Sequence, residues 1–176
     1  MILRKKLGLP PTFFMNIKNV KPTLKTGYRQ GYFSPMNSEK YLGNPSEIIY
    51  RSSWELKFFQ FCDSTESVIS WGSESTPIKY WNPILKQEST YWVDCYMATK
   101  SPEGEITKWL IEVKPQKYLS PPEAPNRLTE KATLNYARHA KAYIINDAKF
   151  RAAKVYAKKN NMRFGIITEN FLFNKV

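Results

Sequence analysis

The fold of this chain is limited most by a pair of short apolar runs that each contain a single carboxylate. Residues 91–97 and 109–113 have the length and the composition of buried strands. Asp94 interrupts the first run, and Glu112 stands near the end of the second. Aspartate is depleted in strands, and burying an unpaired carboxylate is costly. The sequence therefore predicts a site in which a metal or a lysine compensates Asp94. The alternative is an exposed strand face or a hydrogen bond to a neighbouring turn.

The other segments follow an order typical of a mixed α/β sheet. Ser52 begins a predicted helix that continues to Cys62, and the turn residues at 102–105 predict a hairpin between the two apolar runs. Further strands are predicted at 68–71, 78–81 and 163–168, and further helices at 128–145 and 148–159, the last capped by Asp147. The order of helix, strands, helices and strand predicts an α/β fold with a mixed sheet.

Glu112 and Lys114 lie two residues apart at the end of the second apolar run. Because strand side chains alternate between faces, these two share one face, opposite Ile111 and Val113. On that face Glu112 can ligate a hard divalent cation, and Lys114 can position or activate a water or stabilise charge on a phosphate. Glu-x-Lys alone is a weak motif, because an exposed strand with a simple charge pair gives the same pattern.

Two interpretations fit Glu55. Ser52 and Glu55 have the spacing of a capping box, in which the glutamate bonds back to the start of the helix. At about 100° per residue, however, Glu55 falls inside the apolar arc formed by Trp54, Phe58 and Cys62. A carboxylate on the core-facing side of a helix favours a role in a site over a solvated cap.

Residue counts exclude several common sites. The single histidine, His139, excludes an HExxH zinc site, and Cys62 and Cys95 are too few for a zinc finger. The chain contains neither a GxxxxGK[ST] nor a GxGxxG phosphate loop. His139 lies in a basic helical pattern and is expected at the surface. Glu74 is expected in a turn rather than as a further acid of the site.

The charge distribution points to a polyanionic partner. The net charge is +12, yet residues 46–114 carry ten acids against seven basic residues. Residues 1–45 carry eight basic residues and one acid, and residues 115–176 carry twelve and four. An acidic centre between two basic flanks favours DNA or RNA as partner. Solvated basic faces around an ordinary core would give the same counts.

Residues 1–45 combine this basic charge with frequent glycine, proline and aromatic residues, and they show neither a helical nor a strand period. We predict a largely irregular N-terminal arm at 1–45, extended when free and ordered by a partner, and a folded domain at 46–176. No stretch has the roughly 18 apolar residues of a membrane span, and the start of the chain lacks the apolar core of a signal peptide. These features predict a soluble intracellular protein with no membrane partner.

Four segments carry a resemblance to a known superfamily, in the order YRSSWE at 50–55, WGSE at 71–74, YWVD at 91–94 and IEVKP at 111–115. Together they resemble the PD-(D/E)xK nucleases over roughly residues 40–172. Within that superfamily the chain is similar to the transposon end-cleaving nucleases and to the head-completion nucleases of large contractile-tailed phages. Val93 replaces the usual proline before Asp94. The resemblance implies a restriction-endonuclease-like mixed sheet flanked by helices, with an α-β-β-β-α-β core.

The resemblance also implies a function and a site. The function is a magnesium-dependent DNA endonuclease, with Mn²⁺ able to substitute, that acts in head completion after DNA packaging. Its catalytic residues would be Glu55, Asp94, Glu112 and Lys114, and its metal ligands the same three acids with the carbonyl of Val113. Basic residues that flank this set are expected to grip the DNA backbone: Arg51, Lys117, Arg127 and Lys131.

The same resemblance implies a place in the virion at the head–neck region, and in the host cytoplasm during assembly. Portal or neck proteins would bind the N-terminal arm. A structural connector that keeps a nuclease fold for binding, without essential cleavage, is the alternative. The complete set of acids and lysine argues against a dead enzyme. A plain RNA-binding protein is disfavoured, because no RNP-type aromatic signature is present.

Overall fold

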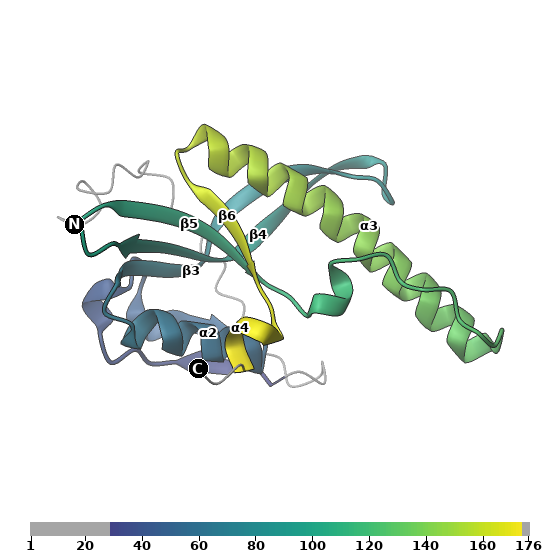
Figure 1. Cartoon of the computed structure of the whole chain (residues 1–176), viewed down its shortest axis with the longest axis horizontal. Helices are drawn as coiled ribbons and strands as arrows, with labels where there is room; N and C mark the ends of the chain where they lie inside the picture. Colours follow the sequence, from purple (N-terminus) through teal and green to yellow (C-terminus); the bar gives the residue numbers. More distant parts are fainter. Residues whose placement is uncertain (1–28, 174–176) are drawn as a thin grey trace.

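A computed structural model describes residues 29–173 of the chain, and its centre is a four-stranded sheet of order β3-β4-β5-β6 (Figure 1). The strands are β3 (Val68–Asn82), β4 (Gln87–Lys100), β5 (Ile106–Val113) and β6 (Arg163–Ile167). The first three pair antiparallel, and β6 pairs parallel to β5. Helices α2 (Ser53–Ser64) and α3 (Glu130–Lys159) cover opposite faces, and the short α4 (Glu169–Phe173) follows β6. This order confirms the predicted α-β-β-β-α-β core.

The alternation of side chains along β4 builds two hydrophobic layers. Tyr96 and Ala98 pack on the side of α3, in a cluster with Leu110 of β5. Cys95 and Met97 point to the other side and pack with the residues of α2. Because successive strand residues face opposite ways, one apolar strand supplies both layers. The sheet is therefore covered on both faces, as the apolar runs of the sequence predicted.

The predicted strands at 68–71 and 78–81 are parts of the single strand β3. A β-bulge lies between Ser73 and Thr76, so the strand continues through the residues expected to form a turn. Glu74 is in this bulge with a φ of 41°, a left-handed conformation that is uncommon for residues other than glycine. The expectation that Glu74 is a turn residue was wrong, since the ladder to β4 resumes directly after it.

The predicted helices at 128–145 and 148–159 are one helix of 30 residues, α3. Asp147 does not cap a second helix but lies within α3, where it pairs with Arg151 at 2.9 Å. The C-terminal half of α3 packs on the sheet through a stripe of buried residues: Asn146, Phe150, Ala153 and Ala157. Its N-terminal half projects beyond the sheet (Figure 1). No helix within residues 29–173 has both the length and the apolar composition needed to cross a membrane.

The segment before α2 is attached to the domain. Strand β1 (Gly31–Phe33) pairs antiparallel with β2 (Ile48–Tyr50), and the 3-10 helices η2 (Ser38–Lys40) and η3 (Pro45–Glu47) lie between them. The buried carboxylate of Asp63 accepts hydrogen bonds from the backbone N–H groups of Met36 and Asn37, at 2.8 and 3.0 Å. Tyr41 and Leu42 are also buried.

The domain itself therefore orders residues 29–45. The rest of the predicted arm, residues 1–28, lies outside the described residues, and the division of the chain at residue 45 stays a prediction.

Candidate active site

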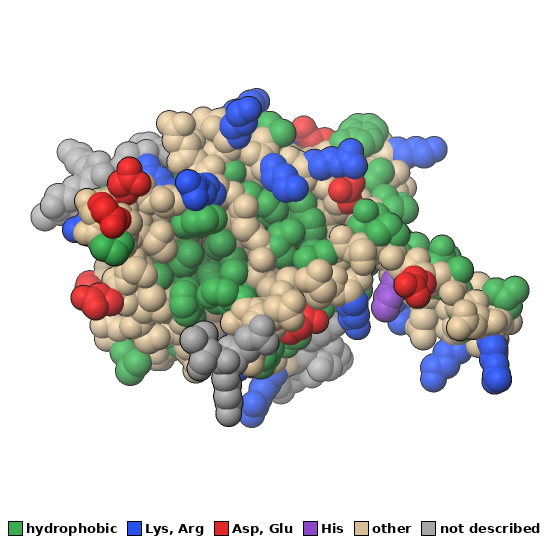
Figure 2. Space-filling view, in the orientation of Figure 1, with side chains coloured by type: hydrophobic (Ala, Val, Ile, Leu, Met, Phe, Trp, Pro, Cys, Tyr) green, Lys and Arg blue, Asp and Glu red, His purple; other side chains and the backbone are tan. Residues whose placement is uncertain are grey.

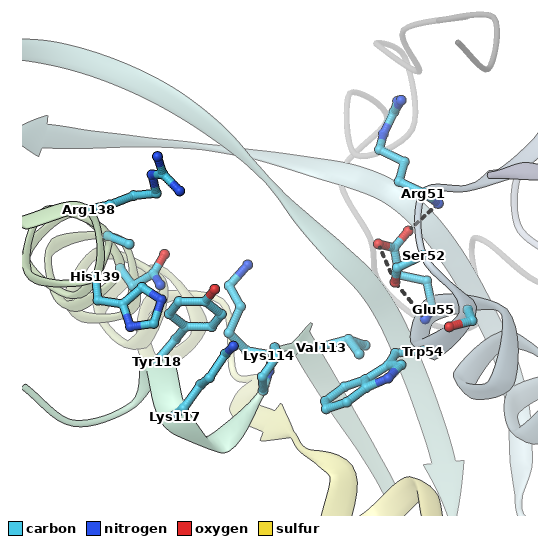
Figure 3. Close-up of a pocket in the computed structure, with 14 residues that line it drawn as sticks. Arg51, Ser52, Trp54, Glu55, Val113, Lys114, Lys117, Tyr118, Arg138 and His139 are labelled. Carbon is cyan, nitrogen blue, oxygen red and sulfur yellow. Dashed lines mark hydrogen bonds between the residues drawn. The ribbon is translucent and has the colours of Figure 1, made fainter. Parts of the chain in front are cut away.

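A cleft of about 690 Å³ lies where the start of α2, the end of β5 and the middle of α3 meet. In Figure 3, Arg51, Ser52 and Glu55 lie on one side of it, and Tyr118, Arg138 and His139 lie on the other. Val113 and Lys114 line the cleft between these two walls. Of the predicted site residues, Glu55, Val113 and Lys114 line the cleft, whereas Asp94 and Glu112 are not among its lining residues.

Asp94 lies on β4 opposite the bulge of β3. Its Oδ2 accepts a hydrogen bond from the peptide N–H of Val113 at 2.7 Å. Tyr91 and Val93 pack toward α3, and so does Tyr96, so the alternation of β4 shifts by one residue at Asp94. This irregularity turns the carboxylate toward the end of β5, where it meets the Val113 N–H.

Glu112 and Lys114 share one face at the end of β5, as predicted. The ammonium of Lys114 lies 3.2 Å from Oε1 of Glu112. The side chain of Glu112 is only 4% exposed, and its Oε2 has no hydrogen-bond partner among the described residues. A buried carboxylate oxygen without a partner is costly, which makes it the strongest indication that another group belongs beside it.

Both interpretations of Glu55 hold in part. The Ser52 hydroxyl caps α2 by accepting from the Glu55 N–H at 3.1 Å, and the Glu55 carboxylate accepts from the Ser52 hydroxyl and from the Arg51 N–H at 3.1 and 2.9 Å. The carboxylate also lines the cleft. Burial, and next the charge of Asp94, raise the pKa of Glu55 to about 7.

The carboxylates repel one another in a poorly solvated place. Burial, and then the charge of Glu112, raise the pKa of Asp94 to about 7, although Lys114 opposes this shift. Burial disfavours the charge of Lys114, but Glu112 and Asp94 outweigh it, so its pKa lies above the usual value. Beside these free carboxylates Lys114 is therefore a charged hydrogen-bond donor at neutral pH.

The donor set suits a hard divalent cation, because it is made of carboxylate oxygens with excess negative charge. Within residues 29–173, no three histidine, cysteine or acidic side chains are arranged closely enough to hold a metal as they stand. The carboxylate of Glu55 is bound by the Arg51 N–H and the Ser52 hydroxyl. The structure thus brings Asp94, Glu112 and Lys114 together and leaves Glu55 at the edge of the group.

The predicted DNA-binding residues do not share one environment. Lys117 and Arg51 both line the cleft, but the guanidinium of Arg51 is bound by Glu74. Arg127 and Lys131 are exposed, before and at the start of the projecting half of α3, and are not among the residues that line the cleft. Figure 2 shows further Lys and Arg side chains at this projecting end and along α3.

The sequence did not identify several residues of this site, among them Tyr118, Arg138, His139 and Glu74. Arg138 and His139 line the cleft, and the ring of His139 packs edge-on against Tyr118 with centroids 5.3 Å apart. Both lie within the predicted helix at 128–145, but local spacing does not show which face of that helix meets the cleft. Glu74 was missed because a β-bulge cannot be read from periodicity, although it ends the WGSE segment that carried part of the resemblance.

Comparisons with known proteins identify the family of the chain. The family model described as TnsA-like endonuclease N terminal matches residues 65–169, a range that holds Asp94, Glu112 and Lys114 but not Glu55. The chain is also 34% identical over 142 residues to the head completion nuclease of Enterobacteria phage T4, covering 81% of this chain and 92% of that protein. Both similarities read from the sequence, to transposon nucleases and to phage head-completion nucleases, are confirmed. The chain belongs to the TnsA-like endonuclease family.

Proposed function

We propose that this protein is a metal-dependent DNA endonuclease that acts in phage head completion after the DNA is packaged. The observation that carries the proposal is the buried, unpartnered Oε2 of Glu112, which lies on the same carboxylate that Lys114 holds through Oε1. Asp94 is close enough for the charge of Glu112 to raise its pKa. A divalent cation would give Oε2 of Glu112 a partner and would offset the repulsion between Glu112 and Asp94. Mg²⁺ is the ion that suits an all-oxygen donor set and a phosphate substrate.

Asp94, Glu112 and Glu55 would hold the cation, with the Val113 carbonyl as a fourth donor. When bound, the cation supplies Lewis acidity at the phosphate oxygens. Glu112 and Asp94 keep their orientation through Lys114 and the Val113 N–H, at 3.2 and 2.7 Å. The charged ammonium of Lys114 is suited to orient the attacking water and to stabilise charge on the phosphate. In hydrolysis the oxygen of that water forms a bond to phosphorus while the bond from phosphorus to the leaving oxygen breaks. The proton that the water loses ends on the leaving oxygen.

Basic residues on the α3 side of the cleft would bind the DNA backbone. Lys117 and Arg138 line the wall opposite α2, and Tyr118 and His139 give that wall an aromatic surface. Contacts of this type go to phosphates and sugars, so they position a duplex without reading its sequence. Arg127 and Lys131 would extend the same grip along the projecting half of α3.

A place in head completion follows from the head completion nuclease of phage T4, to which the chain is similar over 81% of its length. In this proposal the protein acts in the assembling virion, where head and neck meet. Portal or neck proteins would bind the basic residues at the start of the chain.

The test is cleavage of plasmid and branched DNA by the wild type and by Asp94→Ala, with Mg²⁺, with Mn²⁺ and with EDTA. We expect cutting that requires the metal and that the variant has lost, while both proteins bind DNA equally in EDTA. Wild-type DNA binding without any cutting, in every metal, would contradict the endonuclease and favour a structural connector. Equal cutting by both proteins would contradict the assignment of Asp94.

A further inference from the structure

Arg51 and Glu74 form a two-pronged ion pair at the rim of the cleft. Nε and Nη2 of Arg51 donate to Oε1 and Oε2 of Glu74, at 2.6 and 2.8 Å. Such a fork-to-fork geometry fixes the guanidinium more firmly than a single contact does. Glu74 reaches this position from the β-bulge, with a backbone φ of 41° that its surroundings must hold in place.

Arg51 starts beside the proposed metal-binding acids. Its backbone N–H donates to Oε2 of Glu55 at 2.9 Å, so its side chain begins next to that carboxylate. Glu74 lies in the bulge, opposite Asp94 in the sheet. The hydrogen bonds to Glu74 raise the pKa of Arg51 most, and the charges of Glu55 and Asp94 raise it further.

An arginine so placed has two possible partners, Glu74 or the acids of the site. A guanidinium bound to Glu55 or Asp94 would neutralise the charge that attracts a cation and would occupy the oxygens that ligate it. Glu74 accepts from two separate nitrogens of Arg51 and so prevents this alternative.

We infer that Glu74 is a positioning residue that holds the Arg51 guanidinium away from Glu55 and Asp94 and thereby keeps these acids available to the metal. The inference rests on the proposed metal site. It assigns Glu74 no contact with metal or DNA, since both of its oxygens are bound to Arg51.

The experiment is a thermal-shift titration of the DNA-free full-length protein with Mn²⁺ and with Mg²⁺. It compares the wild type with Glu74→Gln, Arg51→Gln and the double variant. Glu88→Gln is the matched control, because it breaks an ion pair of similar length, 2.9 Å to Lys79, at the exposed end of the β3–β4 hairpin. The quantity measured is the metal concentration that gives half of the maximal shift in Tm.

We expect Glu74→Gln to raise this concentration about tenfold, because the freed guanidinium competes with the metal. The double variant should return to the value of Arg51→Gln, since no guanidinium is left to compete, and Glu88→Gln should match the wild type. If the ion pair only stabilised the fold, the double variant would not regain the metal affinity of Arg51→Gln.

Three results would overturn the inference. Glu74→Gln could bind metal like the wild type, or the double variant could stay as weak as Glu74→Gln, which would mean that Glu74 acts without Arg51. Absence of any metal-induced shift in the wild type would overturn the proposed metal site together with the inference, and this pattern is distinct from the other two.

Discussion

At the scale of single residues, the surroundings of Asp94 have opposite effects on the charge of its carboxylate. Its carboxylate is anchored by the Val113 N–H, yet burial and Glu112 raise its pKa to about 7. Without a cation, the folded protein therefore holds a proton that the unfolded chain releases near pH 4. The proton bound at Asp94 stabilises the folded state relative to the unfolded chain. This contribution to the free energy of unfolding is complete below the unfolded pKa and is lost as the pH rises toward 7.

This sign gives a prediction for Asp94→Asn, whose side-chain oxygen can still accept from Val113. In EDTA at pH 8 the variant should melt above the wild type, by roughly 2–4 °C for each kcal/mol recovered. The difference should narrow at pH 5, where wild-type Asp94 is protonated. The same variant should lose metal-dependent cutting. Calorimetry at both pH values measures the effect, and identical pH dependence of the two proteins would contradict the crowded carboxylate site.

Lys114 should affect cleavage but not the affinity for metal. Its ammonium is charged and holds Glu112 without being a ligand. Lys114→Ala should therefore reduce the cleavage rate by roughly 10²–10³-fold, the range for loss of one donor that stabilises developing charge. The half-saturating Mn²⁺ concentration in a thermal-shift titration should change much less than for Asp94→Asn. A variant that cuts DNA at the wild-type rate would contradict the role given to Lys114.

At the scale of elements, η4 (Gln116–Tyr118) and the middle of α3 form the wall of the cleft that would contact the DNA backbone. Lys117→Ala and Arg138→Ala should each weaken binding to any DNA sequence. Each should reduce the slope of log affinity against log salt by about 0.9. Lys79→Ala is the control, since Lys79 pairs with Glu88 on the hairpin and does not line this cleft. An unchanged salt slope in both cleft variants would mean that DNA follows another surface.

Another element-scale prediction concerns the attachment of residues 29–45. Asp63 accepts two backbone N–H groups from Met36 and Asn37, so Asp63→Ala leaves both donors without their acceptor. The free energy of unfolding should fall by roughly 1–3 kcal/mol for each donor left unsatisfied. Urea denaturation measures this, with the exposed Glu66→Ala as control. Equal stability of the two variants would show that this attachment contributes little.

At the scale of the whole molecule, deletions separate the arm from the domain. Deletion of residues 1–28 should leave the melting temperature unchanged, as expected of an arm that is extended when free. Deletion of residues 1–45 also removes Tyr41 and Leu42, which are buried, and should cost roughly 1.5–3 kcal/mol for each. Both truncated proteins can be compared by calorimetry. Equal destabilisation by the two deletions would place the boundary before residue 29.

The order of elements and the position of Lys114 on the same strand face as Glu112 could be predicted from the sequence. Both follow from the alternation of apolar residues and from local spacing. The sequence could not predict the β-bulge at Glu74, since an extra residue in a ladder depends on the partner strand. It divided α3 in two because Asp147 is as good a cap as it is a partner for Arg151. The ion pair of Arg51 with Glu74 joins residues 23 positions apart, and no local pattern reports it.

The projecting half of α3 has a consequence for the footprint of the protein on a duplex. The first eight residues of α3, at 130–137, precede the cleft-lining Arg138, and at about 1.5 Å per residue they reach about 12 Å beyond the cleft. At 3.4 Å per base pair, that length matches about three to four base pairs. Protection from chemical cleavage should therefore be lopsided around the scissile bond. Shortening the duplex on the side of the helix should abolish cutting sooner than equal shortening on the other side.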